Sequence, residues 1–253
     1  MSQEITLSVI AICVVAAFLA GFVDAVAGGG GLIQLPVLLL VFPNAALASL
    51  AGTNKSASIV GTTGAAATYA RKMPIDRKLL APMATAAFVG SAGGAALVTR
   101  VSRVWFEPVI LVVLIAITIF TLLRPDVGAI DVAQPRGPLA STALAFAIGF
   151  YDGIMGPGTG MFLVLGLVAY VGCSFLTASA LAKFVNVATN LAALVVFIPI
   201  GHVMWAVTAF MAPANLLGGL VGARTALNRG SAFVRAIFLT MIAVLIIRLV
   251  ISI

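Results

Sequence analysis

Charged residues are scarce in this chain. Of its 253 residues, Asp, Glu, Lys and Arg make up only 8%, whereas 62% are hydrophobic. A water-soluble domain of this length needs a charged surface, usually about a quarter of its residues. The composition therefore excludes a soluble globular protein. It predicts an all-α integral membrane protein, because helices satisfy their own backbone hydrogen bonds in lipid.

Histidine and cysteine are also rare. His202 is the only histidine, and the two cysteines, Cys13 and Cys173, stand far apart in apolar stretches. A metal centre needs several such ligands together, so we expect no metal site and no cofactor. No basic stripe with interleaved aromatic residues is present, which excludes nucleic acid as a partner. The excess of 14 basic over 7 acidic residues is expected to fix the membrane topology instead.

Apolar stretches follow one another along the whole chain. A helix needs roughly 20 apolar residues to cross a membrane, so the two shortest stretches cannot cross alone as straight helices. Met1 to Glu4 lack the positive charge of a cleaved signal peptide, and the first stretch is therefore expected to be a retained helix. The ten predicted segments are 5–23, 31–42, 45–70, 79–99, 104–123, 138–151, 160–172, 174–200, 203–223 and 232–252.

The two halves of the chain repeat one another at one constant separation along the sequence. At this separation, which we call the repeat offset, Asp24 matches Asp152, and Lys55 matches Lys183. Chance would rarely place two intramembrane acids and two intramembrane lysines in phase, so we predict an internal duplication. The predicted parts are a first transmembrane repeat, a linker and a second transmembrane repeat, at 1–123, 124–137 and 138–253.

The basic residues indicate whether the repeats are parallel or inverted. With about five segments in each repeat, nine of the 14 Lys and Arg would face the cytoplasm and three the opposite side. With four spans in each repeat, the split would be seven to five. Cytoplasmic loops carry the excess of basic residues, so the sequence favours two inverted repeats, an arrangement found in secondary transporters. The nine are Arg71, Lys72, Arg77, Lys78, Arg124, Arg136, Arg224, Arg229 and Arg235, and the three are Arg100, Arg103 and Arg248.

Each repeat contains a glycine-rich break before its short segment. A helix that restarts after a break presents unpaired N–H groups and the positive end of its dipole, which suits an oxyanion. We therefore expect broken or re-entrant helices here, with main-chain groups that bind substrate. Tight helix packing is the alternative use of such glycines. The candidate binding glycines are Gly28, Gly29, Gly30, Gly156 and Gly158.

Polar side chains accompany both predicted intramembrane lysines. Asn54 precedes Lys55, and Asn186 and Asn190 follow Lys183 at spacings that place them on one helix face. Lysine supplies a full positive charge, and asparagine supplies N–H donors to the oxygens of an anion. These five residues are therefore candidate ligands of a small anion between the repeats.

Asp24 and Asp152 are candidates for coupling or gating. Burial disfavours a charged carboxylate, so either residue could carry a proton or exchange lysine partners. Two purely structural Asp–Lys bridges are one alternative. An intramembrane aspartyl protease that uses both acids is another, because Tyr151-Asp152 is similar to one motif of such enzymes. Its second motif, Gly-x-Gly-Asp, is not matched at Gly21-Phe22-Val23-Asp24.

These motifs resemble those of the TauE/SafE family of membrane proteins, also called sulfite exporters. The similarity covers nearly the whole chain and is carried by 21–33, 52–55 and 149–160. It implies an inner-membrane permease for sulfur oxyanions or organosulfonates. By motif it also implies functional roles for Asp24, the glycine run, Asn54 and Lys55, and for their repeats Asp152, Gly156, Gly158 and Lys183. The second repeat has Ala182 at the position of Asn54, which makes the two half-sites chemically unequal.

The sequence thus predicts a secondary transporter rather than an enzyme. We expect it to export small anions such as sulfite by alternating access, with the site between the repeats. Its expected partners are the anionic solute and the lipid bilayer of the inner membrane, and a homodimer is left open. A non-transporting membrane subunit is the remaining alternative, and the sequence does not separate a carrier from a channel.

Overall fold

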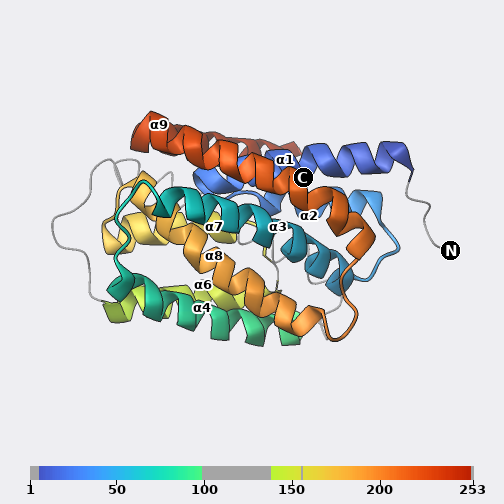
Figure 1. Ribbon diagram of the computed structural model, residues 1–253, viewed down its shortest axis with the longest axis horizontal. Coiled ribbons are helices and arrows are strands. Elements are labelled where there is room, and N and C mark those ends of the chain that lie inside the picture. The colour runs from blue at the N-terminus through green and yellow to red at the C-terminus, as the bar shows by residue number, and fades with distance from the viewer. Residues whose placement is uncertain (1–5, 99–137, 155, 252–253) are drawn as a thin grey trace.

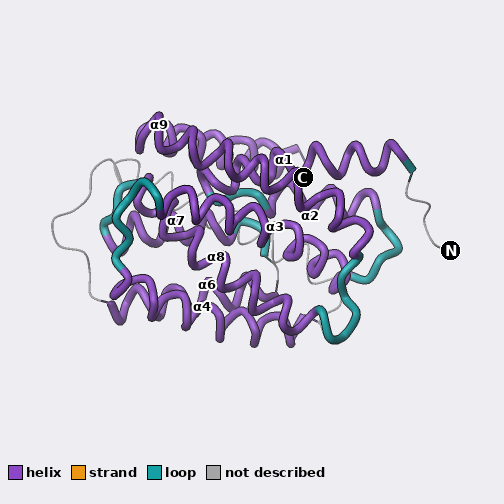
Figure 2. The backbone as a smooth tube through the Cα atoms, viewed as in Figure 1, coloured by secondary structure: helices purple, strands orange, loops and turns teal. Residues whose placement is uncertain are grey.

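The computed structural model describes residues 6–98, 138–154 and 156–251. All regular structure in these ranges is helical, and Figure 2 shows the helices joined by short loops. The predicted all-α fold is confirmed. Several parts of the topology prediction lie outside the described residues: the segment at 104–123, the linker at 124–137 with its two arginines, Arg100, Arg103 and the side chain of Arg248.

The described helices fall into two sets, one in each half of the chain. In the first half, α1, α2, α3 and α4 span Leu7–Ala27, Gly31–Val41, Leu47–Ala70 and Arg77–Val98. In the second half, α6, α7, α8 and α9 span Pro138–Ile154, Thr159–Gly166, Phe175–Phe197 and Trp205–Ile251, and α7 continues into a π-helical turn, η1, at Leu167–Val171. The short helices α2 and α7 follow the glycine-rich breaks, as predicted.

The outer surface of the described helices is apolar. The side chains of Leu7, Leu40 and Leu139 are at least 80% exposed, whereas Lys183 is fully buried. This distribution is the reverse of that in a water-soluble protein and suits contact with lipid. Four described helices, α1, α4, α8 and α9 as far as Val244, are long and apolar enough to cross a membrane. The chain is a multi-pass membrane protein.

Helix α9 corresponds to the two segments predicted at 203–223 and 232–252. It consists of two helices joined across a kink at Gly230, where the backbone is not helical. Gly230 has a φ of 74° and a ψ of −172°, a conformation that favours glycine. The predicted break between the two segments is confirmed, and it lies at this one residue.

The helices of the two halves begin at matching positions. The first residues of α7, α8 and α9 are related by the repeat offset to those of α2, α3 and α4, respectively. Their packing is matched as well: α1 packs along α9, and its counterpart α6 packs along α4, while α3 and α8 meet in the centre. The first helix of each half, α1 or α6, thus packs against the fourth helix of the other half, α9 or α4.

Glycines allow these helix pairs to approach closely. A Cβ added at Gly90 would lie against the main-chain oxygen of Phe146, and one at Gly218 against that of Phe18. The repeat offset relates these two contacts to one another. Close packing through small residues is typical of helices in membranes, and it is the use that these two glycines have here.

The connections between corresponding helices lie at opposite ends of the molecule. In Figure 1, the connection from α3 to α4 is at the left end of the long axis, and the connection from α8 to α9 is at the right end. Helix α1 begins at the right, whereas α6 begins at the left. Corresponding helices therefore run in opposite directions along this axis.

Candidate functional site

The two glycine-rich breaks meet at the centre of the molecule. Helix α1 ends at Gly28, which has a φ of 83°. A Cβ on Gly28 would overlap the main chain of Gly160, and one on Gly31 would lie 3.2 Å from the main-chain oxygen of Gly156. The first turns of α2 and α7 are thus held next to one another, but the N–H groups of Leu32, Ile33 and Thr159 already donate to carbonyls of the two breaks.

The last turn of α1 is closed by side chains from two other helices. Carbonyl groups at a helix end have no partner within the helix and are costly to leave unpaired in lipid. Three consecutive carbonyls of α1 accept hydrogen bonds here. Lys183 Nζ donates to the oxygen of Asp24 at 2.6 Å, Tyr69 Oη to that of Ala25 at 2.9 Å, and Ser179 Oγ to that of Val26 at 2.6 Å.

Lys183 also forms an ion pair with the side chain of Asp24. Its Nζ lies 2.7 Å from Asp24 Oδ2, and the lysine side chain is 0% exposed while that of Asp24 is 20% exposed. A positive charge is favourable at the C-terminus of a helix. Lys183 therefore serves both the main chain and the carboxylate of one residue, and it joins α8 to the end of α1.

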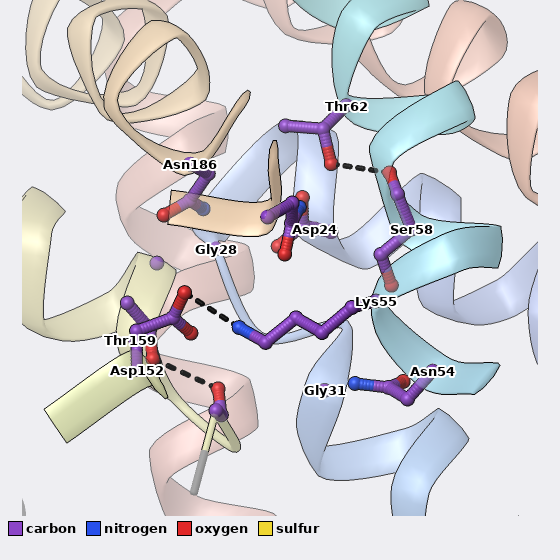
Figure 3. A pocket seen from close by; sticks show the side chains of 13 residues that line it. Asp24, Gly28, Gly31, Asn54, Lys55, Ser58, Thr62, Asp152, Thr159 and Asn186 are labelled. Carbon is purple, nitrogen blue, oxygen red and sulfur yellow. Dashed lines mark hydrogen bonds and ion pairs between the residues drawn. The ribbon is translucent and has the colours of Figure 1, made fainter. Parts of the chain in front are cut away.

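The second ion pair joins Lys55 of α3 to Asp152 of α6. The Nζ and Oδ2 atoms are 2.5 Å apart, and the side chains are 5% and 4% exposed. Figure 3 shows Lys55 reaching across a pocket to Asp152. A Cβ on Gly156 would lie 3.3 Å from Lys55 Nζ, so the ammonium group rests against the break that precedes α7. Each ion pair joins a lysine of one half to an aspartate of the other.

A small pocket lies where the breaks and the helices α3, α6 and α8 converge. The free space inside it is about 30 Å³, room for two or three water molecules. Eight of the predicted site residues line it, together with five others. The eight are Asp24, Gly28, Asn54, Lys55, Asp152, Gly156, Asn186 and Asn190, and the five are Gly31, Ser58, Thr62, Thr159 and Gly160.

Four predicted site residues do not line the pocket. Lys183 is behind it, bonded to the end of α1. Gly29 packs against apolar side chains, and a Cβ on Gly30 would lie 2.6 Å from Asp24 Cβ. Gly158 has a φ of 80° and precedes the first residue of α7. The two halves therefore do not contribute equally: Lys55 faces the cavity and Lys183 does not.

Two of the additional lining residues belong to the polar cluster that surrounds Lys55 in the sequence. Ser58 and Thr62 follow Lys55 by three and seven residues, which places them on its face of α3. Thr159 and Gly160 gave no such signal, because their position depends on how the two breaks cross.

Two buried amide groups in the pocket have unused hydrogen-bonding capacity. Asn54 and Asn186 are 4% and 7% exposed, and the Oδ1 atom of each has no hydrogen-bond partner among the described residues. Buried polar atoms are nearly always paired. An amide can also rotate to present its N–H₂ group in place of its oxygen. Both residues can thus serve a bound solute or water.

A buried network supports the first half of the pocket. Gln34 donates a hydrogen bond to the main-chain oxygen of Asn54 at 3.2 Å and accepts one from Asn215 at 2.8 Å. Asn215 also donates to the main-chain oxygen of Ala17 at 3.1 Å. The network ties α1, α2 and α9 to α3 directly before Lys55.

The second half has no equivalent of this network. Phe162, Ala87 and Ala182 occupy the positions related by the repeat offset to Gln34, Asn215 and Asn54. Instead, Phe162 packs edge-to-face on Tyr151, whose hydroxyl donates to the oxygen of Pro157 at 2.7 Å. The unequal half-sites that Asn54 and Ala182 suggested thus extend to the residues behind them.

Comparison with known proteins identifies the family. The model of the sulfite exporter TauE/SafE family matches residues 13–249. The chain belongs to the TauE/SafE family. Three relatives that are 32–37% identical to this chain are each named as a probable membrane transporter protein. No solved structure matches the chain.

Three relatives cover almost the whole TauE/SafE chain. The membrane transporter protein ORF9 of a Sinorhizobium species is 37% identical over 98% of this chain and 94% of the relative. A probable membrane transporter protein of Haemophilus influenzae is 32% identical over 94% of this chain and 93% of the relative. The probable membrane transporter protein YfcA of Escherichia coli K12 is 34% identical over 90% of this chain and 85% of the relative. The family and these relatives show that the chain is a membrane transporter.

Proposed function

We propose that this TauE/SafE protein is a secondary carrier of small anions, with sulfite, other sulfur oxyanions and organosulfonates as its substrate class. The observation that carries the proposal is the position of Lys55. Its ammonium group lines the central pocket, and Asp152 is its ion-pair partner. The carrier lies in the inner membrane and exports its substrate by alternating access.

The proposed architecture is a pair of inverted repeats, at 1–123 and 138–253. Two observations support it. The starts of α7, α8 and α9 are related by the repeat offset to those of α2, α3 and α4, and the connections between corresponding helices lie at opposite ends of the molecule in Figure 1. A site between inverted repeats can open to either side when one repeat rocks against the other.

The pocket chemistry suits an oxyanion. Lys55 supplies the positive charge, and Asn54 and Asn186 supply amide groups that can donate to its oxygens. An oxyanion needs more room than the present 30 Å³. Binding therefore requires the pocket to widen and Lys55 to turn from Asp152 toward the solute.

The alternative functions receive less support. An aspartyl protease requires two carboxylates that share a proton, whereas Asp24 and Asp152 each face a lysine. A non-transporting subunit does not agree with relatives that are described as transporters. The family name favours a sulfur oxyanion over other small anions.

Flux measurements test the proposal. The purified protein, reconstituted in vesicles, should carry radiolabelled sulfite or thiosulfate, and Lys55→Ala should reduce this flux at least about tenfold, one tenfold step being about 1.4 kcal/mol. Lys72→Ala is the matched control, because Lys72 is exposed and outside the pocket. A Lys55→Ala variant that folds and transports at the wild-type rate would refute the role of Lys55.

A binding screen identifies the substrate independently of flux. A ligand that binds only the folded protein raises its melting temperature by mass action. We expect at least one of sulfite, sulfate, thiosulfate and sulfoacetate to stabilise the wild-type protein in detergent. The stabilisation should disappear in Lys55→Ala and remain in Lys72→Ala.

A further inference from the structure

We propose that binding of the anion at Lys55 is coupled to protonation of Asp152, so that the carrier moves one proton with each anion. The inference rests on the proposed function, and it assigns the coupling ion and its site. Of the two buried ion pairs, it selects Lys55–Asp152 as the pair that opens and Lys183–Asp24 as the pair that stays closed.

The partners of the two lysines differ. Lys183 donates to both the main-chain oxygen and the carboxylate of Asp24, and Tyr69 and Ser179 close the same helix end beside it. The positions related to Ser179 and Tyr69 by the repeat offset are Ala51 and Phe197, whose side chains have no donor. Lys55 therefore has no equivalent framework at the end of α6.

The lysine that is free to turn is also the one that faces the cavity. Departure of Lys183 from Asp24 would break two hydrogen bonds at the end of α1, one to the main-chain oxygen and one to the carboxylate. Lys55 can leave Asp152 by rotation of its own side chain into the pocket that it already lines. An anion in the pocket thus competes with Asp152 for a single ammonium group.

When Lys55 turns to the anion, Asp152 loses its counter-ion. Asp152 is 3% exposed, and its Oδ2 atom has no hydrogen-bond partner among the described residues apart from the ion pair with Lys55. A buried carboxylate without a cation is strongly disfavoured. A proton that enters the open site from the surrounding aqueous phase, together with the anion, removes this charge.

Within the described parts of the chain, no other cation faces Asp152. Helix α7 has no ionisable residue, and α4 has none after Lys78. Across the pocket, Asp24 is held by Lys183 of α8. On α6 itself, the hydroxyl of Tyr151 is directed to Pro157. The ionisable groups around Asp152 are thus Lys55, which has left, and groups that are already paired or are acidic.

The exchange keeps the site electrically neutral. Before binding, Lys55 and Asp152 neutralise one another. After binding, the ammonium of Lys55 neutralises a monovalent anion, and Asp152 carries the proton in uncharged form. No covalent bond other than the O–H bond of Asp152 forms or breaks. Transport of a monovalent anion would then move no net charge, and its direction would follow the combined gradients of anion and proton.

The test uses vesicles that contain the full-length protein and a pH-sensitive dye. Radiolabelled methanesulfonate and isethionate are the probes, because both are organosulfonates that carry a single negative charge at neutral pH. We expect the lumen to acidify by one proton for each anion that enters, and an imposed inward proton gradient to drive accumulation of the anion. Anion entry without acidification would overturn the coupling but leave the carrier function intact. If neither probe moves, the proposed function fails, and the coupling fails with it.

Asp152→Asn separates transport from coupling. Asparagine resembles a protonated aspartate, so this variant should still exchange labelled for unlabelled anion but should lose both acidification and pH-driven accumulation. Asp76→Asn is the matched control, because Asp76 is an exposed carboxylate at the start of α4; it should stay fully coupled. A folded Asp152→Asn variant that still acidifies the lumen, or that no longer exchanges anions, would overturn the proposal.

Discussion

The main chains of Gly28 and Gly160 are in direct contact. A Cβ on either residue would overlap the backbone of the other. Gly28 ends α1 in the left-handed region, with a φ of 83°, and Gly160 lies in the first turn of α7. This contact fixes the depth at which the two broken helices cross, and the pocket with Lys55 is built around it.

Gly28→Ala should prevent assembly of the protein. The substitution combines a disfavoured φ, which costs on the order of 1–3 kcal/mol, with overlap of two backbones. We expect little monodisperse protein on size-exclusion chromatography in detergent. Gly93→Ala is the control, because the atoms nearest to a Cβ there are 3.8 Å away; it should fold normally and gain slightly from alanine's helix propensity. Normal assembly of Gly28→Ala would contradict the crossing of the breaks.

The two lysines should differ in their contribution to stability. Lys183→Met removes the cation that pairs with the Asp24 carboxylate and leaves the main-chain oxygen of Asp24 with only the bond from the Gly28 N–H, and it should lower the free energy of unfolding by about 3–5 kcal/mol. Lys55→Met should cost less, about 1–3 kcal/mol, because Lys55 bonds only the carboxylate of Asp152, whereas Lys183 bonds both the carboxylate and the main-chain oxygen of Asp24. Thermal unfolding of both variants in the same detergent measures the difference. Equal destabilisation would mean that the two ion pairs have the same role.

The network behind Asn54 should matter for both stability and binding. Gln34→Met removes two buried hydrogen bonds and should destabilise the protein by about 1–3 kcal/mol. It should also weaken anion binding, because the backbone before Lys55 loses its support. Thr85→Val is the control: its exposed hydroxyl bonds only to its own helix, so it should change stability by less than about 0.5 kcal/mol. Ligand-induced shifts in melting temperature report binding, and an unchanged shift in Gln34→Met would exclude a positioning role.

Inverted repeats predict opposite membrane sides for corresponding loops. Asp76, before α4, and Ile200, before α9, are both exposed. We expect Asp76→Cys to be labelled by an impermeant thiol reagent only from the cytoplasmic side, and Ile200→Cys only from the other side. The native cysteines are buried and should give a low background. Labelling of both variants from one side would establish parallel repeats.

Much of the fold could be predicted from the sequence because lipid imposes simple rules. Long apolar stretches must be helices there, and the glycine-rich breaks at Gly28 and Gly156 interrupt two of them. The matched pairs of Asp24 with Asp152 and of Lys55 with Lys183 pointed to the residues that form the two ion pairs. Charge in an apolar interior is so costly that its position was informative by itself.

Other features depend on contacts that no local pattern encodes. The difference between Lys183 and Lys55 depends on Ser179 and Tyr69, which meet the end of α1 from two separate helices. Only the packed structure shows that these side chains converge on one helix end.

The closure of α1 by three donors also has an energetic consequence for the proposed cycle. In a carrier with two identical halves, the inward-open and outward-open forms would have equal energy by symmetry. Here one broken helix is anchored by Lys183, Tyr69 and Ser179, and the matching positions of the other hold Lys55, Phe197 and Ala51. The empty carrier should therefore rest mainly in one orientation, and solutes that arrive from the two sides of the membrane should meet different apparent affinities.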